Sequence, residues 1–495
     1  LQAKGGKSYA IALEAYAGHN FPGVHPAHTE GSADGVVYVR KEDRKYSTVE
    51  LVVERPEVSR FVFGLRALRQ LSEVLDPNSL RRGRIIHAFE EIFRVAWARP
   101  EETSEETWQQ GIAEAMAVIQ PLLEQKNGPT APMMGIVGHS HIDTAWLWTI
   151  AETWRKLGRT YSSVLALMDQ YPEFKFTQSA AYHYEKAREL YPEVFDRVVE
   201  RVKEGRWEVN GAMYIEPDCN IPSGESFVRQ CLVGQRSYRE MFGKITDALW
   251  QPDVFGYSAA LPQILQKSGV KYFLTTKLSW NDTNRFPYDT FWWQGIDGSR
   301  VLAHFNEMQG ELDPAKLTKL WNDVLHKDVQ DRRFCGFGWG DGGGGPMAEM
   351  IEMARLCEDL EGCPKTEYTS ITEFMNGMES ELTSLPTWVG ELYLELHRGT
   401  LTSIAEIKRL NRKLEFDFRD AEFVWTLAAL KGNAYPREDF LEAWKVLLVN
   451  QFHDILPGSS IAAVNDQAKA EMSELENRVA EIEGEAHALL AGDID

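Results

Sequence analysis

A regular alternation of short apolar runs and longer helix-like stretches occupies the middle of the chain, from Met133 to about Pro386. The apolar runs include Gly135–Val137, Trp207–Val209, Ala248–Trp250 and Tyr272–Leu274. Such alternation is typical of an α/β fold with a mainly parallel sheet, because parallel neighbours are joined by crossover helices. We therefore expect an α/β domain over residues 131–390, with its sheet either open or closed into a barrel. In both forms, ligands bind beyond the carboxyl ends of the strands, so the polar residues after each run are the first site candidates.

The segments on either side of this domain have different periodicities. Residues 1–56 contain two strand-like apolar runs, which predict a partial β region. Residues 57–130 carry apolar residues at three- and four-residue steps, the stripe of amphipathic helices, and we expect a helical linker there. Residues 400–495 carry three long stripes of the same kind, which predict a three-helix bundle after the α/β domain.

The balance of charges limits the partners of this chain. Its 74 acidic and 53 basic residues give a formal net charge of −21, which repels the phosphates of nucleic acids and of anionic lipids. No stretch of the sequence approaches the ~18 consecutive apolar residues of a membrane-spanning helix. We therefore expect neither a nucleic acid nor a membrane as a partner.

The cysteines indicate the compartment. There are five, an odd number, and no two of them form a C-x-x-C pair. This pattern favours reduced thiols over a disulfide framework, as in cytosolic proteins. We expect a cytoplasmic location, with a vacuolar or lysosome-like compartment as the less favoured alternative. The sequence does not indicate the oligomeric state, and a homo-oligomer is one of the alternatives.

The first group of polar residues follows the apolar run that ends at Val137 and contains His139, His141 and Asp143. In extended backbone, residues two apart point the same way, so these three side chains can face one pocket. Imidazole nitrogen and carboxylate oxygen are zinc ligands, and the H-x-H-x-D spacing therefore indicates a metal site. The spacing does not decide which histidine binds the metal, and hydrogen bonding within a core is the alternative explanation.

Two further groups lie at the ends of predicted elements. Asp253 follows a short apolar strand and precedes a helix-like segment, so capping that helix is the alternative to a catalytic role. His453 comes at the end of a helix, where a cationic side chain is favoured by the helix dipole. Neither residue alone indicates a function.

In this order, the three groups resemble glycoside hydrolase family 38, the α-mannosidases, from about Met133 to the carboxyl end. The resemblance implies that one zinc ion is held by His141, Asp143, Asp253 and His453, the last of these supplied by the helical bundle. It implies that Asp253 is also the nucleophile, in a β/α catalytic domain whose sheet can be a seven-stranded barrel. Nitrogen and oxygen ligands also accept cobalt or manganese.

The resemblance further implies a retaining exo-α-mannosidase that removes terminal mannosyl residues from oligosaccharides. Retaining glycosidases use two carboxyl groups about 5–5.5 Å apart, one as nucleophile and one as acid/base. A zinc ion with open coordination positions can bind two adjacent sugar hydroxyls and stabilise the transition state. Two alternatives remain: a metal-dependent carbohydrate deacetylase, in which the metal activates water, and a sugar-binding fragment with impaired catalysis.

The acid/base role is assigned to Asp341, which lies in the glycine-rich run Gly340–Pro346 after a strand-like segment. This run resembles the cytosolic and vacuolar branch of the family. Glycines permit unusual backbone angles and the close approach of a substrate, although a loop tip without function is the alternative. Glu395 is the second candidate for the acid/base.

Four further residues are expected near the substrate, in or beside stretches that resemble the same family. Asp218 and His397 are expected to form hydrogen bonds with sugar hydroxyls. Trp280 is expected to stack on a sugar ring, and Arg398 to lie at the substrate or to anchor a carboxylate by a bidentate pair. Family members carry further β-rich domains after the helical bundle, so the resemblance implies that this chain is a fragment without them.

Overall fold

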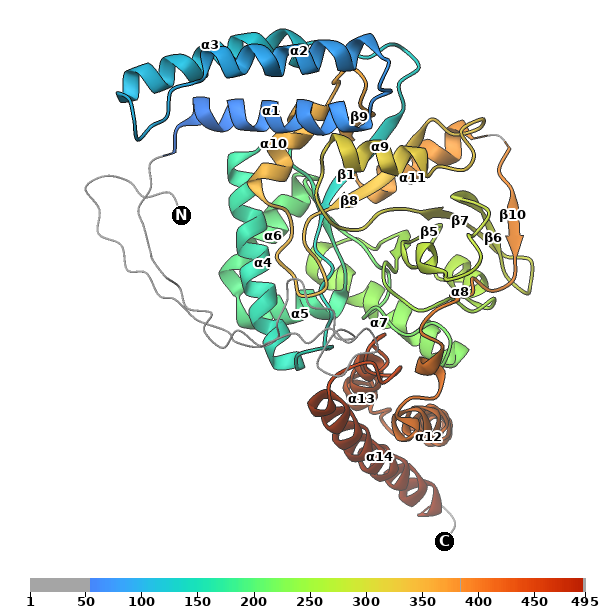
Figure 1. Ribbon diagram of the computed structural model, residues 1–495. Coiled ribbons are helices and arrows are strands. Elements are labelled where there is room, and N and C mark those ends of the chain that lie inside the picture. Colours follow the sequence, from blue (N-terminus) through green and yellow to red (C-terminus); the bar gives the residue numbers. More distant parts are fainter. Residues whose placement is uncertain (1–53, 383, 493–495) are drawn as a thin grey trace, which may run out of the picture. The chain divides into compact units, whose positions relative to one another are not determined.

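The computed structural model describes residues 54–382 and 384–492. The β region expected over residues 1–56 lies almost entirely outside the described residues. In the described part, three helices come first, followed by an α/β domain and then by a helical bundle (Figure 1). This order confirms the predicted fold class, an α/β domain with a mainly parallel sheet followed by a helical region.

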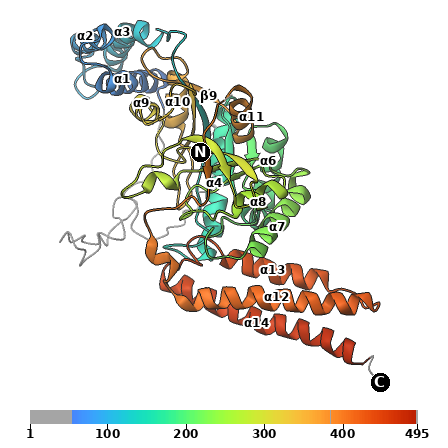
Figure 2. The same cartoon turned by 90° about the vertical axis from the view of Figure 1, so that its right-hand side faces the viewer.

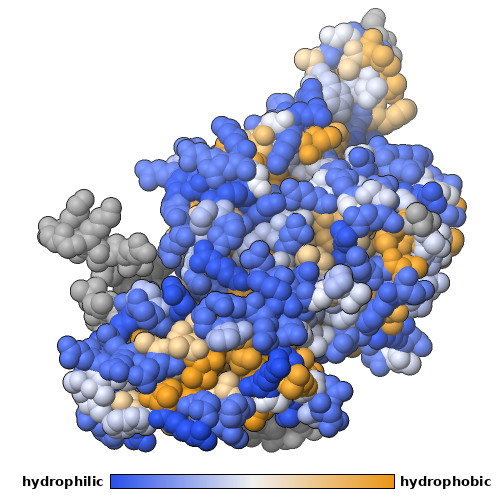
Figure 3. All heavy atoms as spheres, turned by 90° about the horizontal axis from the view of Figure 1, so that it is seen from above, coloured by the Kyte–Doolittle hydropathy of each residue, from blue (hydrophilic) through white to orange (hydrophobic). Residues whose placement is uncertain are grey.

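The first three helices are α1 (Pro56–Val74), α2 (Leu80–Val95) and α3 (Glu105–Leu123). Their starts follow from the local sequence, because a proline opens α1 and the side chains of Ser79 and Ser104 cap α2 and α3 by accepting backbone N–H bonds. Seen from the side of these helices, the surface is largely hydrophilic with a few apolar patches (Figure 3). Phe93 and Trp97, near the end of α2, have exposed fractions of 82% and 68%.

In the described residues, ten strands form two sheets of five strands each. The first sheet is parallel throughout and has the order β3-β2-β1-β8, with β9 paired to β1. The second has the order β10-β6-β7-β5-β4, and only its β6–β7 pair is antiparallel. The strands are β1 (Met133–His139), β2 (Phe176–Gln178), β3 (Trp207–Val209), β4 (Ala248–Trp250), β5 (Tyr272–Thr275), β6 (Thr290–Gln294), β7 (Arg300–Phe305), β8 (Arg332–Phe337), β9 (Lys365–Tyr368) and β10 (Thr387–Val389).

Backbone hydrogen bonds join the two sheets along both edges. At one edge, the N–H of Gly211, just after β3, donates to the carbonyl of Ala248 in β4 over 3.3 Å. At the other, the N–H of Gly336 in β8 donates to the carbonyl of Glu307, just after β7, over 2.8 Å. The strands β1, β2, β3, β4, β5, β7 and β8 therefore follow one another around a closed ring, which agrees with the seven-stranded form of barrel.

Helices cover the outside of this ring (Figure 1). Strands β1, β4 and β5 are buried almost along their whole length, and their sequences are mostly apolar rather than alternating, as in parallel sheets covered on both faces. In the core, for example, the rings of Phe176 and Trp207 lie 4.7 Å apart, and burial of each such side chain stabilises the fold by roughly 1.5–3 kcal/mol. The helices are α4 (Ile150–Gln170), α5 (Ala181–Leu190), α6 (Pro192–Lys203), α7 (Gly224–Phe242), α8 (Leu261–Lys267), α9 (Pro314–Asn322), α10 (Ala348–Cys357) and α11 (Ile371–Glu381).

The last described elements are three long helices that lie side by side (Figure 2). They are α12 (Ala405–Leu430), α13 (Arg437–Asn450) and α14 (Ala462–Ala491). Between them, Phe418 stacks on Trp444 with 4.3 Å between ring centroids, and the indole N–H of Trp425 donates to a carbonyl of α14. None of the helices in the described part of the chain is long and apolar enough to cross a membrane.

Candidate metal centre

Four side chains from three distant segments meet at the carboxyl ends of the strands. His141 and Asp143 follow β1. Asp253 follows β4, and His453 follows α13 of the bundle. One ligand atom of each residue lies within 4.8 Å of those of the other three, and all but the partly exposed Asp253 are buried. The structure thus brings together the four residues that the sequence predicts as metal ligands, here called the ligand group.

Short distances between nitrogen and carboxylate oxygen define the ligand group. Oδ1 of Asp143 lies 2.9 Å from Nε2 of His141 and 3.3 Å from Nε2 of His453. Oδ2 of Asp253 lies 4.0 Å from Nε2 of His141. Among the described residues, Nε2 of His453 has no hydrogen-bond partner of good geometry although it is buried. A buried polar atom without a partner lowers the stability of the fold, unless a proton or a metal ion binds to it. Two nitrogen and two carboxylate ligands suit zinc, so the residues present fit one divalent cation.

The electrostatics of the ligand group also favour a cation. Burial opposes a charge on His453, but the close carboxylates of Asp143 and Asp454 outweigh it and raise the pKa of His453 to about 9. The pKa of His141 is raised as well, against the effect of burial, by Asp143 and Glu216. The two histidines therefore lie in a negative potential. A divalent cation bound there would take the place of protons, because metal ligands must be deprotonated.

A backbone carbonyl fixes the orientation of His453. Its Nδ1 lies 3.0 Å from the carbonyl oxygen of Glu216, so in the neutral ring Nδ1 carries the proton and Nε2 presents its lone pair to the ligand group. The side chain of Glu216 is buried, accepts a hydrogen bond from Ser179 and approaches Nδ1 of His141 to 3.5 Å. The sequence predicts site residues in the stretch that contains Glu216 but singles out only Asp218 there.

His139 shares the H-x-H spacing but lies outside the ligand group. Its Nδ1 lies 3.0 Å from the carbonyl oxygen of Met308, and its ring packs against Trp250 with 4.2 Å between centroids. Burial, and then the charge of His141, lowers the pKa of His139 to about 3. Of the two histidines in the pattern, only His141 is placed to bind a metal.

A buried lysine binds the second oxygen of Asp253. Nζ of Lys277, which is 3% exposed, lies 2.6 Å from Oδ1 of Asp253, while Oδ2 faces His141. The same ammonium group lies 4.0 Å from the ring centroid of Trp280. Lys277 was not predicted from the sequence. Its position just after β5 is the signal that would have found it, because polar residues beyond the strand ends line such sites.

Asp341 lies in the glycine-rich loop after β8, with a left-handed φ of 58°. Its carbonyl oxygen accepts the backbone N–H of Asp143 over 2.8 Å, which ties the loop to the ligand group. Gly338, at the start of the loop, has a φ of 128°, and a Cβ there would meet the carbonyl oxygen of His139, so this position requires glycine. Burial, and then the charges of Asp143 and Asp253, raise the pKa of Asp341 to about 6.

Glu395, the second acid/base candidate, lies in a surface loop outside the ligand group. Its carboxylate accepts hydrogen bonds from the backbone N–H groups of Thr283 and Asn284, over 3.2 and 2.6 Å. In this structure, Glu395 therefore holds a turn.

Two of the four predicted sugar contacts lie beside the ligand group. The ring of His397 packs edge-on against Phe255 and Trp280, with 4.6 and 6.2 Å between centroids. Phe255 also packs against His453, at 5.9 Å, so these rings form a continuous wall from the ligand group outward. Trp280 is 46% exposed and can present its ring to a ligand.

The other two predicted contacts form bonds within the protein. Oδ1 of Asp218 accepts the backbone N–H groups of Asn220 and Ile221, over 2.9 and 2.7 Å, and so closes a turn. Arg398 forms a bidentate pair with Asp282, over 2.9 and 3.3 Å. Arg398 also lines a hollow of about 570 Å³ next to Phe255 and His397.

Two family descriptions match the chain. "Glycosyl hydrolases family 38 N-terminal domain" matches residues 132–391, and "Alpha mannosidase middle domain" matches residues 395–490. The first match includes the residues of the ligand group that follow β1 and β4, and the second includes His453.

Several curated relatives of this chain are named alpha-mannosidases. The chain is 37% identical over 433 residues to "Alpha-mannosidase G" of Dictyostelium discoideum, which covers 86% of this chain and 39% of the relative. It is 37% identical over 429 residues to "Alpha-mannosidase 2C1" of Homo sapiens, a match that covers 85% of this chain and 40% of the relative. It is 40% identical over 348 residues to "Alpha-mannosidase" of Saccharomyces cerevisiae, covering 66% and 32%. The chain thus spans two fifths or less of the length of these relatives.

A solved structure supports the fold. An alpha-mannosidase from Enterococcus faecalis V583 aligns with a TM-score of 0.65 at 22% identity, over 73% of this chain and 43% of that chain. The resemblance that the three motif groups indicate is confirmed by the family matches over both domains. The chain belongs to glycoside hydrolase family 38.

Proposed function

We propose that this chain is the catalytic part of a retaining, zinc-dependent exo-α-mannosidase that removes terminal α-mannosyl residues from oligosaccharides. The observation that carries the proposal is the convergence of two histidines and two aspartates from three distant segments on one buried point. We assign residues 131–390 as the catalytic domain, residues 400–495 as the bundle that supplies one metal ligand, and residues 57–130 as a helical linker.

The ligand group would hold the cation. Bound zinc would supply Lewis-acid binding of two neighbouring sugar hydroxyls, and cobalt or manganese are alternatives that accept the same ligands. The chain's own contribution is orientation. The carbonyl of Glu216 holds the ring of His453, and the hydrogen bond from Asp143 to Asp341 holds the segment that carries His141.

Asp253 is the proposed nucleophile, because its two oxygens have different surroundings. Oδ1 pairs with Lys277 at 2.6 Å, and Oδ2 faces His141 at 4.0 Å. The ion pair holds the carboxylate in one orientation, and the side chain keeps an exposed fraction of 16% through which a sugar can approach. A carboxylate fixed in this way is ready to attack the anomeric carbon of a sugar held beside it.

Asp341 is the proposed acid/base. The hydrogen bond from Asp143 to its carbonyl oxygen keeps it next to the ligand group. A second carboxyl group on the far side of the sugar is what retention requires, one to attack and one to protonate the leaving oxygen. The pKa of about 6 that burial and then the charges of Asp143 and Asp253 give to Asp341 agrees with a group that both donates and accepts a proton near neutral pH.

Trp280 and His397 are proposed to contact the sugar, since both belong to the aromatic wall beside the ligand group. For Asp218 and Arg398, the contacts favour an indirect part in substrate binding. The backbone N–H of Asp218 donates to the carbonyl of Gln451, two residues before His453, over 2.8 Å. Arg398 orients the carboxylate of Asp282, which lies in the loop beside Trp280.

The proposed location is the cytoplasm. All five cysteines lie in the described part of the chain, where they are buried and form no disulfide. Reduced, buried thiols are typical of a reducing compartment.

Hydrolysis of 4-nitrophenyl α-D-mannoside by the purified chain tests the proposal. We expect activity that disappears with a chelator, returns with added zinc and is lost in Asp253→Asn at equal metal content. Proton NMR of the first product should show α-mannose, the sign of retention. Activity that persists without metal, or β-mannose as the first product, would contradict the proposal.

A sugar-binding fragment with impaired catalysis is the second candidate, because the chain spans two fifths or less of its relatives' length. It predicts that the chain binds zinc and mannose but does not hydrolyse the aryl mannoside. Turnover by this chain alone would exclude it.

A further inference from the structure

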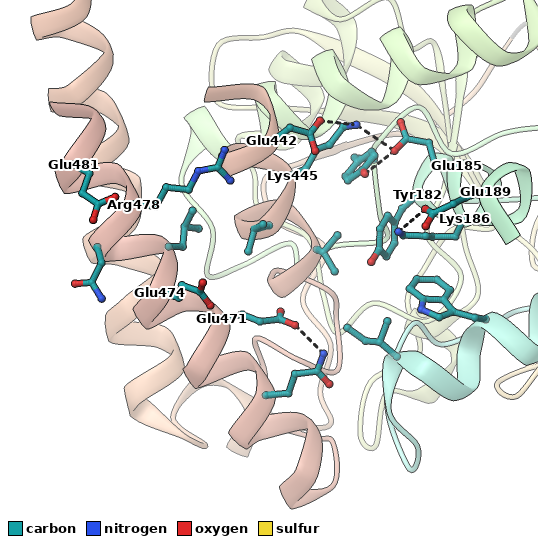
Figure 4. A pocket seen from close by; sticks show the side chains of 18 residues that line it. Tyr182, Glu185, Lys186, Glu189, Glu442, Lys445, Glu471, Glu474, Arg478 and Glu481 are labelled. Atoms are coloured by element: carbon teal, nitrogen blue, oxygen red, sulfur yellow. Dashed lines mark hydrogen bonds and ion pairs between the residues drawn. The ribbon is translucent and has the colours of Figure 1, made fainter. Parts of the chain in front are cut away.

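A large cavity lies between the helical bundle and the α/β domain (Figure 4). It has a volume of about 1040 Å³, and its lining comes mainly from α4, α5, α13 and α14. No residue of the ligand group lines it. Ligand pockets in proteins measure about 300–1,000 Å³, so this bundle cavity has room for a ligand of several rings.

One wall of the bundle cavity is aromatic. Trp154 of α4 meets Tyr182 of α5 edge to face, with 5.3 Å between ring centroids, and Tyr182 lies 5.5 Å from Tyr214. Val449 and Leu475 also line the cavity, but their side chains are almost fully buried behind this wall. Such a wall suits the C–H faces of sugar rings, because aromatic side chains offer a large apolar surface together with a polar edge.

Charged side chains of both signs line the rest of the bundle cavity. The lining contains six glutamates and three basic residues. Lys186 pairs with Glu189 at 2.7 Å, and Lys445 pairs with Glu185 and Glu442, both at 3.3 Å. In the close-up, these pairs lie on the side of α5 and α13, opposite the acidic residues of α14 (Figure 4).

Two of the glutamates on α14 remain open to a ligand. Glu474 and Glu481 are exposed and lie seven residues apart, on one face of the helix. Neither side chain forms a hydrogen bond or an ion pair with any other residue between 54 and 492 that the structure describes. Their carboxylates are therefore available to accept hydrogen bonds from outside.

The mixture of charges limits the class of ligand. Six carboxylates against three basic side chains leave the lining net negative, which repels an anion. A neutral ligand with many hydroxyls avoids this repulsion, and its O–H groups can donate to the open carboxylates. Its C–H faces can cover the rings of Trp154 and Tyr182. A carbohydrate has all of these properties.

We propose that the bundle cavity is a second oligosaccharide-binding site, separate from the metal centre. The choice of a mannosyl oligosaccharide as its ligand rests on the proposed function, whereas the presence of the site does not. A glycan held there stays close to the enzyme between encounters with the metal centre, which raises its effective concentration.

Calorimetric titration of the Asp253→Asn protein with an α-linked mannotetraose counts the sites without turnover. We expect two sites per chain, and one when Trp154→Ala is added. Trp97→Ala removes a tryptophan that is 68% exposed near the end of α2 and should leave both sites. If the metal centre binds no mannoside, the Asp253→Asn protein should show one binding site, and Trp154→Ala should remove it. A failure of the proposed function can therefore be distinguished from a failure of the second site.

Glu474→Gln is the second variant, because an exposed side chain can change without harm to the fold. It should weaken binding in the bundle cavity about three- to tenfold. Glu485→Gln, on the same helix but outside the lining, is the matched control and should change nothing. Both Trp154→Ala and Glu474→Gln should leave kcat/KM for 4-nitrophenyl mannoside unchanged, because this small substrate does not need the bundle cavity.

Two results would overturn the proposal. The first is a site count that Trp154→Ala does not change, together with an affinity that Glu474→Gln does not change. The second is tighter binding of spermidine than of mannotetraose, lost with Glu474→Gln, since that would assign the bundle cavity to cations.

Discussion

The ligand group and the bundle cavity differ in how their polar atoms are satisfied. In the ligand group, His141, Asp143 and His453 are buried, and one nitrogen of His453 has no hydrogen bond of good geometry with the described residues. In the bundle cavity, both lysines are paired with glutamates, and the open carboxylates of Glu474 and Glu481 face solvent.

This difference indicates how much each region depends on its ligand. A buried polar atom without a partner costs about 1–3 kcal/mol, so the ligand group is stable only when a proton or a metal completes it. Exposed carboxylates are hydrated and cost nothing when no ligand is bound. Single substitutions should therefore cause large losses at the ligand group and small losses at the bundle cavity.

The largest loss is expected for Asp253→Asn. An amide cannot attack the anomeric carbon, so kcat should fall by roughly 10⁴-fold or more, even when excess zinc keeps the ligand group loaded and with the fold unchanged. Steady-state kinetics with an aryl mannoside, alongside elemental analysis, measures both quantities. The matched control is Asp331→Asn, whose side chain is 77% exposed. A loss of less than tenfold in Asp253→Asn would remove the contrast between the two regions.

His453→Ala should lower the affinity for zinc by more than about 10²-fold, because even loss of a residue behind a metal ligand costs about 10–100-fold. Excess zinc should restore part of the activity. Titration against a competing chelator gives the affinity, with the exposed His487→Ala on α14 as the control. If the affinity for zinc is unchanged in His453→Ala, the helical bundle does not supply a metal ligand.

Lys277→Met should lower kcat by about 10²-fold, the lower range for loss of a fixed donor in a catalytic site. The carboxylate of Asp253 then loses the partner that holds its Oδ1, whereas the affinity for zinc should change little. Lys277→Arg keeps a cation at this position and should recover part of kcat. Equal losses of kcat and zinc affinity would mean that Lys277 supports the metal rather than the nucleophile.

The smallest effect is expected for Glu395→Gln, because this side chain only holds a turn at Thr283 and Asn284. Activity should change less than about threefold. Asp341→Asn is the paired variant, and it should slow substrates with poor leaving groups by about 10²-fold or more. The reverse order of the two losses would transfer the acid/base role to Glu395.

Much of the fold was predictable from periodicity, because buried strands and amphipathic helices differ in period and length. The joining of the two sheets was not predictable. It depends on single backbone bonds, such as Gly211 to Ala248 and Gly336 to Glu307, between residues that leave no periodic signal. The prediction of a mainly parallel sheet also did not single out β6, which runs antiparallel to β7.

The site was predictable where a motif surrounds the residue. His141, Asp143 and Asp253 follow apolar strands within recognisable motifs, and the structure brings them together. Lys277 and Glu216 were not singled out, because each looks like an ordinary charged residue until its buried partner is known. The bundle cavity left no signal in the sequence, since its lining comes from several separate helices.

The most direct test of Asp253 as a metal-dependent nucleophile is to trap the covalent intermediate. The chain is incubated with an activated 2-deoxy-2-fluoro-mannoside, digested and analysed by mass spectrometry. We predict one fluoromannosyl group on the peptide that contains Asp253, formed with zinc and absent after chelation. A label on another carboxylate, or hydrolysis that continues with no label at Asp253, would contradict it.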